Sequence, residues 1–278
     1  MPIVPLMLLI QDPVVMEERL IGPAIPISGG RVKELTIEGS TATLFIPDAW
    51  KKSRRNHLWA HFHSPAWYVV SEYQRGKKND LLLVFNLGQG SSVYEAPFKQ
   101  RSIFQKWVFA VETELGIGIK INDLNFTSFS AGFGAVRRLV DDPYVLKSLR
   151  TVILGDSMYA SLDPASKERK ALREHVDCWR PLVDRALKGK TTVIMTTSQI
   201  TPPYAGTWEV AKALVESTGG AMIDAKMGDC PASSIYGQRL LRRYDKGKWH
   251  VWSYAGKTPE AHMTHARRLA EELLMIPE

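Results

Sequence analysis

The chain has 278 residues, of which 45% are hydrophobic and 23% charged, so it can bury a large core like an ordinary globular protein. With only 2 cysteines, the chain is not a disulfide scaffold, and its 20 glycines have no fixed period, which excludes a collagen-like repeat. No apolar run approaches the roughly 20 residues of a bilayer span, which excludes a transmembrane helix. The 36 Lys and Arg against 29 Asp and Glu give a net charge of +7, which raises the question of nucleic-acid binding.

The N-terminal stretch, residues 1–30, is predicted to approach the fold irregularly, because Pro2, Pro5 and a Gly/Pro cluster at 22–30 interrupt it. Residues 1–10 are apolar but lack a basic segment and a small-residue cleavage site, so we expect no signal peptide and a cytoplasmic location by default. A chain trimmed at a natural cleavage point would look the same, which leaves a secreted or periplasmic location open.

Beyond residue 30, short apolar runs rich in β-branched residues alternate with segments of helical periodicity. Gly39 and Ser40 predict a hairpin between the first two strands. The predicted strands cover residues 31–38, 41–46, 57–63, 81–87, 125–129, 151–155, 191–197 and 249–254. The predicted helices cover residues 97–115, 132–140, 164–188, 207–219 and 262–275. This alternation predicts an α/β fold: a doubly wound, mostly parallel eight-stranded sheet with helices on both faces.

The most specific motif joins the strand at 125–129 to the helix at 132–140 through Ser130. Ser128 and Gly132 stand two residues before and after it, giving S-x-S-x-G, where a nucleophile elbow usually reads G-x-S-x-G. Small residues at these positions let the strand and the helix approach each other, and a serine at the helix start leaves the Ala131 N–H free for an oxyanion. The alternative is an ordinary Gly/Ala-rich helix start capped by a serine.

With this motif, the chain resembles the α/β-hydrolase superfamily of serine hydrolases from about residue 31 to its C-terminus. The resemblance implies one domain over residues 1–278, hydrolysis of a carboxylic ester through an acyl-enzyme, and no cofactor. It also implies the chain order nucleophile, acid, histidine, with the histidine beyond the last strand. The long, charged segment 157–189 is a candidate for a small lid near the mouth of the site.

His262 lies just beyond the last predicted strand, where the resemblance implies the catalytic histidine. His265 is the second choice, and the two residues are spaced so that they could share one helix face and bind a metal. No carboxylate or cysteine ligand lies nearby in the sequence, so we expect no metal. His175 is interpreted as a solvated surface residue and His250 as a side chain that fills a sheet face.

The acid is usually found after the seventh strand, but residues 196–203 contain no carboxylate. Asp156 stands at the end of the preceding strand, where some members of the superfamily carry the acid, and Asp163 is the second choice. A carboxylate there can hold the imidazole tautomer while the other ring nitrogen accepts the serine proton. The alternative for Asp156 is a helix N-cap.

The second oxyanion donor follows the strand at 57–63. Relatives carry a His-Gly pair there, whereas this chain has His63-Ser64-Pro65, and proline has no N–H. We therefore expect the donor to come from Ser64, Ala66 or Trp67. The substrate pocket is predicted to include His63, Trp67 and Tyr94, the last at the end of a Gly/Ser loop over its mouth. His61 and His63 would also suit a metal-dependent hydrolase, but the further ligands are not visible.

Two other classes remain as alternatives. The Gly155-Asp156-Ser157 run resembles the block that carries the nucleophile in SGNH-type esterases, but that block opens its domain, and Pro259 stands where a D-x-x-H motif would need Asp. The chain could also be a binding module or an inactive relative that keeps only the fold. Labelling with a serine-reactive probe distinguishes these alternatives from a serine hydrolase.

The basic residues occur in pairs spread over the whole chain, so we expect no nucleic-acid partner and no membrane span. The substrate is expected to be a small or polymer-derived ester. Oligomeric state is not readable from the sequence, and neither is a pairing of Cys178 with Cys230. The basic pairs are Lys51-Lys52, Arg54-Arg55, Lys77-Lys78, Arg137-Arg138, Arg242-Arg243 and Arg267-Arg268.

Overall fold

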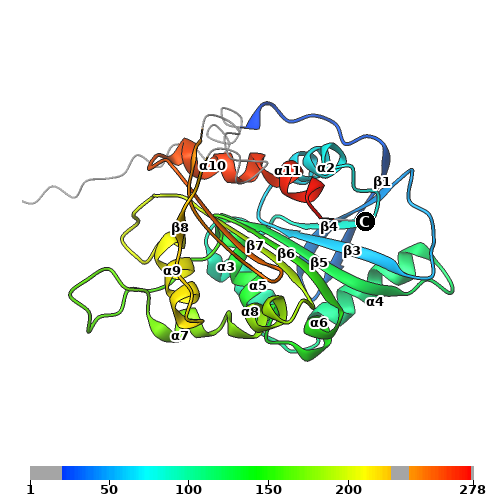
Figure 1. Ribbon diagram of the computed structural model, residues 1–278. Helices are drawn as coiled ribbons and strands as arrows, with labels where there is room; N and C mark the ends of the chain where they lie inside the picture. The colour runs from blue at the N-terminus through cyan, green and yellow to red at the C-terminus, as the bar shows by residue number, and fades with distance from the viewer. Residues whose placement is uncertain (1–20, 227–237, 277–278) are drawn as a thin grey trace, which may run out of the picture.

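The computed structural model describes residues 21–226 and 238–276. Their main feature is one sheet of 10 strands in the order β1-β2-β4-β3-β5-β6-β7-β10-β9-β8, which runs through the middle of the molecule (Figure 1). The apolar start at residues 1–10 and Cys230 lie outside the described residues. Cys178 is a free thiol.

All eight predicted strands are present, and the central six are parallel: β4, β3, β5, β6, β7 and β10 in spatial order. The antiparallel hairpin β1–β2 extends one edge through β4. The strands are β1 (Gly30–Ile37), β2 (Ser40–Pro47), β3 (Asn56–Phe62), β4 (Leu81–Phe85), β5 (Ile121–Phe129), β6 (Leu149–Gly155), β7 (Thr192–Thr197), β8 (Ile223–Asp224), β9 (Leu240–Lys246) and β10 (Trp249–Tyr254).

The prediction of eight strands was wrong by two, because β8 and β9 form an antiparallel extension on β10. Of the seven residues of β9, only Leu240 and Tyr244 are buried, so this edge strand lacks the apolar run that marks the central strands. It turns into β10 through Gly247, whose positive φ of 61° suits a tight hairpin. The first hairpin turns at Glu38 and Gly39, one residue earlier than predicted.

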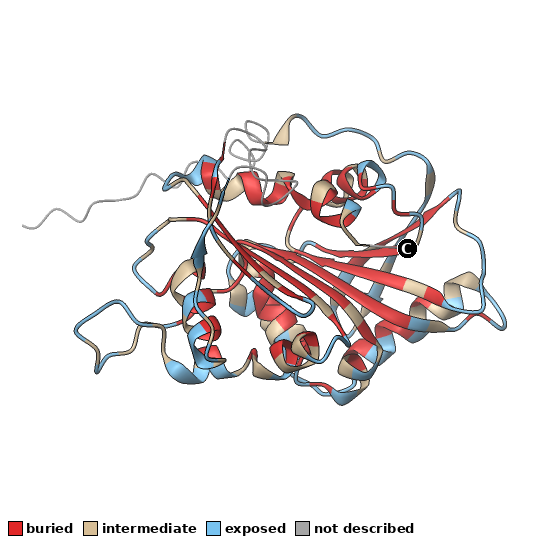
Figure 2. Ribbon diagram, viewed as in Figure 1, coloured by how far each residue is buried: buried red, intermediate tan, exposed pale blue. Residues whose placement is uncertain are grey.

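Helices cover both faces of the sheet (Figure 1). Alternating strand residues supply two cores: Phe62, Phe126 and Leu154 pack on one face, and Trp59, Val84 and Ile153 on the other. Buried residues follow this plan along the strands and the inner helix faces (Figure 2). The helices are α2 (Ala66–Arg75), α3 (Ser91–Glu95), η1 (Ala96–Phe98), α4 (Ile103–Leu115), η2 (Ser130–Gly132), α5 (Phe133–Leu139), α6 (Pro143–Ser148), α7 (Arg173–Asp177), α8 (Arg180–Leu187), α9 (Thr207–Ser217), α10 (Pro259–Arg267) and α11 (Leu269–Leu274).

Three helix predictions need correction. Helix α2 was missed because its buried face consists largely of aromatic and β-branched residues with low helix propensity. The predicted helix at 164–188 forms only from Arg173 onward, as α7 and α8, while the segment before it runs as a loop. The predicted helix at 262–275 breaks at Arg268, whose buried guanidinium lies 3.7 Å from the centre of the Tyr254 ring. Within the described residues, no helix is both long and apolar enough to cross a membrane.

Candidate active site

Ser130 lies on a tight turn between β5 and the one-turn helix η2, at the C-terminal end of the parallel strands. Its φ is +48°, in the left-handed region that residues other than glycine rarely adopt. Such a strained turn lifts a serine hydroxyl away from the backbone, as a nucleophile elbow requires. Ser130 is partly exposed, whereas the seven residues before it are buried.

The residues on either side of Ser130 explain the S-x-S-x-G pattern. A Cβ on Gly132 would lie 2.1 Å from the carbonyl oxygen of Phe62, so only glycine fits where η2 crosses β3. Ser128 is buried, and its hydroxyl lies 2.8 Å from that of Ser157, which donates to the Ser130 carbonyl oxygen at 2.8 Å. Ser128 thus stands where the usual glycine would be, and its hydroxyl stabilises the turn through Ser157.

Asp156 follows β6 and is fully buried. Its Oδ1 accepts the Ser198 N–H at 2.9 Å and the Thr207 hydroxyl, while Oδ2 lies 2.7 Å from His262 Nδ1. Burial would raise the pKa of this carboxyl, but His265, His262 and the Thr207 hydroxyl together hold it well below the usual range. No helix begins at Asp156, so the N-cap interpretation does not apply.

His262 lies in the first turn of α10 rather than in a loop before it. Its Nδ1 faces Asp156, and its ring stacks on Phe129 with centroids 4.6 Å apart. The side chain is 18% exposed, so the ring reaches the surface of the site. His265, one turn further, is 1% exposed and bonds Thr196 Oγ1 through Nδ1 at 2.9 Å, behind the Asp156–His262 pair.

A pocket of about 1050 Å³ opens over Ser130 and His262. No hydrogen bond joins the Ser130 hydroxyl to His262 within the described residues, but both side chains border the same space. The Gly/Ser loop after β4 also contributes to the pocket. Its lining includes Ser130, His63 and His262, together with Ser64, Gln89, Ala131, Phe133, Arg137, Tyr159, His175, Tyr204 and Met263.

His63 and Ser64 follow β3, and the His63 ring stacks on Phe129, the same ring that His262 contacts. Ser64 lines the pocket, and its N–H has no acceptor within the described residues, so it is available to an oxyanion. Ala131 also lines the pocket, at the start of η2, where N–H groups lack partners inside the helix. Ala66 is the first residue of α2 and is absent from the lining.

The three predicted pocket residues occupy different positions. His63 lines the pocket, whereas neither Trp67 nor Tyr94 does. The fully buried Tyr94 supports His63 instead: its oxygen accepts the Leu87 N–H at 3.0 Å and lies 2.9 Å from His63 Nδ1. Burial, with the nearby His262, lowers the pKa of His63 to about 4, so this ring is neutral at physiological pH.

Burial similarly lowers the pKa of His61 to about 3 and of His265 to about 4, from an ordinary value of 6.5. At these positions, as at His63, the unfolded chain binds more protons than the fold below pH 6.5, which lowers the free energy of unfolding as pH falls. The buried Glu272, whose pKa is raised to about 8, offsets about one of the three histidines over this range. Each of these histidines contributes up to about 1.4 kcal/mol per pH unit. We expect urea unfolding to show a clear loss of stability between pH 7 and pH 5, with a shallower slope for His61→Gln. A constant free energy of unfolding over this range would contradict the prediction.

Of the remaining candidates, Asp163 and His250 lie outside the pocket and His175 lines it. Asp163 caps a surface turn, where its Oδ1 accepts the Ala165 N–H at 2.9 Å. His175 is only partly exposed and lines the pocket, which corrects its interpretation as a solvated residue. His250 lies on β10 and pairs with Asp245 at 2.7 Å. Within the described part of the chain, no group of three or more His, Cys, Asp or Glu is arranged to hold a metal ion.

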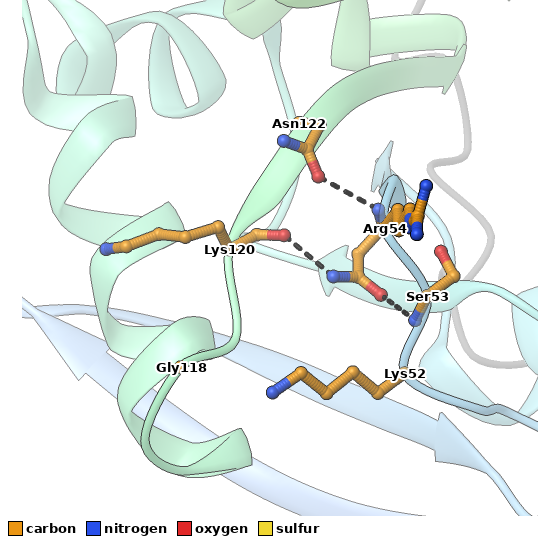
Figure 3. A pocket seen from close by; sticks show the side chains of 7 residues that line it. Lys52, Ser53, Arg54, Gly118, Lys120 and Asn122 are labelled. Atoms are coloured by element: carbon orange, nitrogen blue, oxygen red, sulfur yellow. Dashed lines mark hydrogen bonds between the residues drawn. The ribbon is translucent and has the colours of Figure 1, made fainter.

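A second pocket of about 510 Å³ lies at the N-terminal ends of the parallel strands, where β3 and β5 begin (Figure 3). Lys52, Arg54 and Lys120 make it basic. The side chain of its buried Asn56 makes two hydrogen bonds, accepting the Ser53 N–H and donating to the Lys120 carbonyl, both at 2.9 Å. This arrangement ties the two strand starts together and contains no nucleophile paired with a base.

No family model matches this sequence, and no curated protein matches it. Solved structures do. A feruloyl esterase module from Clostridium thermocellum complexed with sinapinate aligns over 88% of both chains, with 11% identity and a TM-score of 0.50. A thermostable carboxylesterase cloned from a metagenomic library aligns over 94% of this chain and 95% of its own, with 13% identity and a TM-score of 0.50. The chain has the α/β-hydrolase fold.

In an α/β-hydrolase fold the carboxyl ends of the parallel strands meet along one edge, and here Ser130 and Asp156 follow adjacent strands at that edge. Several residues that line the pocket were not identified from the sequence. Phe133 and Arg137 lie on α5 directly after Ser130, and Tyr159 comes three residues after Asp156, so proximity to the motif residues was the available signal. Met263 directly follows His262, so the same signal applied to it, whereas Tyr204 carried no signal of this kind.

Proposed function

We propose that this chain is a serine hydrolase that cleaves a carboxylic ester through an acyl-enzyme, with Ser130 as nucleophile, His262 as base and Asp156 as the acid that orients it. One observation carries the proposal: the buried Asp156 carboxylate lies 2.7 Å from Nδ1 of a histidine that borders the same pocket as a serine on a left-handed turn. The ester-cleaving activities of the structural neighbours agree with this choice of substrate class.

In the proposed reaction, Asp156 accepts the His262 Nδ1–H and leaves Nε2 free to take a proton. The Ser130 oxygen attacks the acyl carbon as its proton passes to Nε2, and the same proton then goes to the departing alkoxide. The Asp156 carboxylate stabilises the imidazolium that forms between these two events. Water, activated by His262 in the same way, then hydrolyses the acyl-enzyme and restores the Ser130 hydroxyl.

The negative charge on the carbonyl oxygen needs preorganised donors. The N–H groups of Ala131 and Ser64 are the pair we propose, since both residues line the pocket. Each such donor typically contributes about 3 kcal/mol to transition-state stabilisation. The His63 ring also lines the pocket and stacks on Phe129, with the ring centroids 6.0 Å apart. Because burial lowers the pKa of His63 to about 4, this ring adds no second positive charge near His262.

Two alternatives make different use of these residues. An SGNH-type mechanism would need Ser157 as nucleophile, but its hydroxyl is fully buried and bonded to Ser128 and to the Ser130 carbonyl. A binding module or inactive relative would keep the pocket without a reactive serine.

A fluorophosphonate probe tests the proposal, because it reacts only with a serine activated by a base. We expect stoichiometric labelling of the folded protein, located to the peptide carrying Ser130 by mass spectrometry, and no labelling after unfolding in urea. Labelling of another serine would identify a different nucleophile. A folded protein that does not react would favour the binding module or inactive relative.

A further inference from the structure

The charge of the pocket lining is one-sided. Among the described residues that line it, three are histidines, none is Asp or Glu, and the only Lys or Arg is Arg137. His63 is neutral at physiological pH. The proposed reaction makes no use of Arg137, so the pocket contains a permanent positive charge that ester hydrolysis alone does not require.

The Arg137 side chain is positioned by two contacts, one with Phe133 and one with Glu95. It follows Phe133 by one turn of α5, and its guanidinium carbon lies 5.4 Å from the centre of that ring. Its side chain is 19% exposed, and its Nη2 donates to Glu95 Oε2 at 2.8 Å. The Nε and Nη1 groups have no acceptor in the described part of the chain, so the guanidinium still has donors to offer.

Glu95 does not cancel this charge, because a second arginine shares it. Arg138 binds the other carboxylate oxygen of Glu95 through its Nε at 2.7 Å. The three side chains therefore carry a net charge of +1. Arg138 is 48% exposed and is absent from the pocket lining, so it is the partner open to solvent, while Arg137 borders the pocket.

His175 adds a second ring donor to the same lining. Its Nδ1 accepts the Ser161 N–H at 3.1 Å, which leaves the N–H on Nε2, 3.8 Å from Glu174 Oε1. An anion in the pocket would meet the Arg137 guanidinium in surroundings that are partly removed from water, where a charge-assisted bond is stronger than at an open surface.

We propose that the pocket selects esters that carry a carboxylate, with Arg137 binding that carboxylate. This inference rests on the proposed ester hydrolysis. Arg137 follows Ser130 by seven residues, about 10 Å along a helix, and helical side chains lean back toward the N-terminus. A carboxylate several atoms from the ester carbonyl therefore fits the distance, and it belongs either to the acyl group or to the alcohol.

Two matched ester pairs distinguish these sources. The acyl pair is the mono(4-nitrophenyl) ester of adipic acid and its terminal amide, and the alcohol pair is 4-carboxyphenyl butyrate and 4-carbamoylphenyl butyrate. For each pair, the ratio of kcat/KM for the carboxylate to kcat/KM for the amide is measured in the wild type, Arg137→Gln, Arg137→Lys and Arg138→Gln. Arg138→Gln is the comparison variant, because it removes an equal charge from beside the same Glu95 but takes no donor out of the pocket.

We expect the wild type to prefer the carboxylate by about tenfold or more in one pair, as a charge-assisted bond predicts. Arg137→Gln should bring that ratio close to one, and Arg137→Lys should keep part of it. Arg138→Gln should lower it only in part, because Glu95 then offsets the Arg137 charge while the Arg137 donors stay in the pocket. Raising the salt concentration should lower the wild-type ratio, which tests the inference even where a variant does not fold. Turnover of the amides without a preference in either pair, or a preference that survives Arg137→Gln, would overturn the inference and leave the proposed function standing. No turnover of any of the four esters, together with an unlabelled Ser130, would overturn both.

Discussion

Ser130→Ala should lower kcat for ester hydrolysis by about four to six orders of magnitude while the protein keeps its fold. The hydroxyl is the proposed nucleophile, and Ser130 is the serine of the lining that stands on the left-handed turn after β5. The substitution removes only one oxygen from a partly exposed residue, so the melting temperature should change by no more than a few degrees. Steady-state kinetics with a 4-nitrophenyl ester and thermal unfolding by circular dichroism measure the two effects.

Ser166→Ala is a matched control for this change. Its hydroxyl accepts the Glu168 N–H in the loop before α7, outside the pocket, and its loss should leave kcat unaltered. Retention of more than about 1% of wild-type kcat by Ser130→Ala would show that the nucleophile lies elsewhere, because removal of a true nucleophile leaves only the contribution of the oxyanion donors and substrate binding.

The sheet was largely predictable because its central strands are buried on both faces. Residues 81–85 and 152–154 are continuous apolar runs, and such runs appear in the sequence whatever surrounds them. The edge strand β9 has the opposite character, since five of its seven residues are partly or fully exposed. Its pairing with β10 depends on backbone hydrogen bonds, which almost any residue type can make, so the sequence gives little indication of this strand.

The candidate site was predictable only as an order of residues along the chain. Asp156 and His262 were identified from their positions relative to strands, but the groups that hold the carboxylate come from elsewhere. Ser198 and Thr207 follow β7, the place where the acid itself usually stands, and they donate to Asp156 instead. A sequence lists these donors without showing that they meet one carboxylate.

Pocket walls were less predictable, because they depend on which way a side chain faces. Tyr94 was predicted to line the pocket but turns inward and supports His63 from behind. Arg137 belongs to one of the basic pairs that are spread over the whole chain, yet it borders the pocket while Arg138 remains half exposed. The two arginines are consecutive residues of α5, so they face different directions, and their identical charges do not show which of them faces the pocket.

His262→Ala and His265→Gln should separate the roles of two histidines that stand one helical turn apart and both lie near Asp156. We expect His262→Ala to lower kcat about as much as Ser130→Ala, because the two side chains act as one unit, and the double variant should be little worse than either single one. His265→Gln should leave kcat within about tenfold of the wild type. It should instead lower the free energy of unfolding by about 1–3 kcal/mol, since it disturbs a buried hydrogen bond to Thr196.

Kinetics and urea unfolding on the same preparations distinguish these outcomes. A folded His265→Gln variant that loses as much kcat as His262→Ala would mean that His265 is the base. Its burial argues against this role, since among the described residues its Nε2 has no hydrogen-bond partner and it does not line the pocket. A double variant much slower than Ser130→Ala alone would mean that His262 acts independently of the serine. The expected pattern, in which only His262→Ala removes catalysis and only His265→Gln costs stability, follows from the direction each ring faces: His262 borders the pocket, and His265 fills the core behind Asp156.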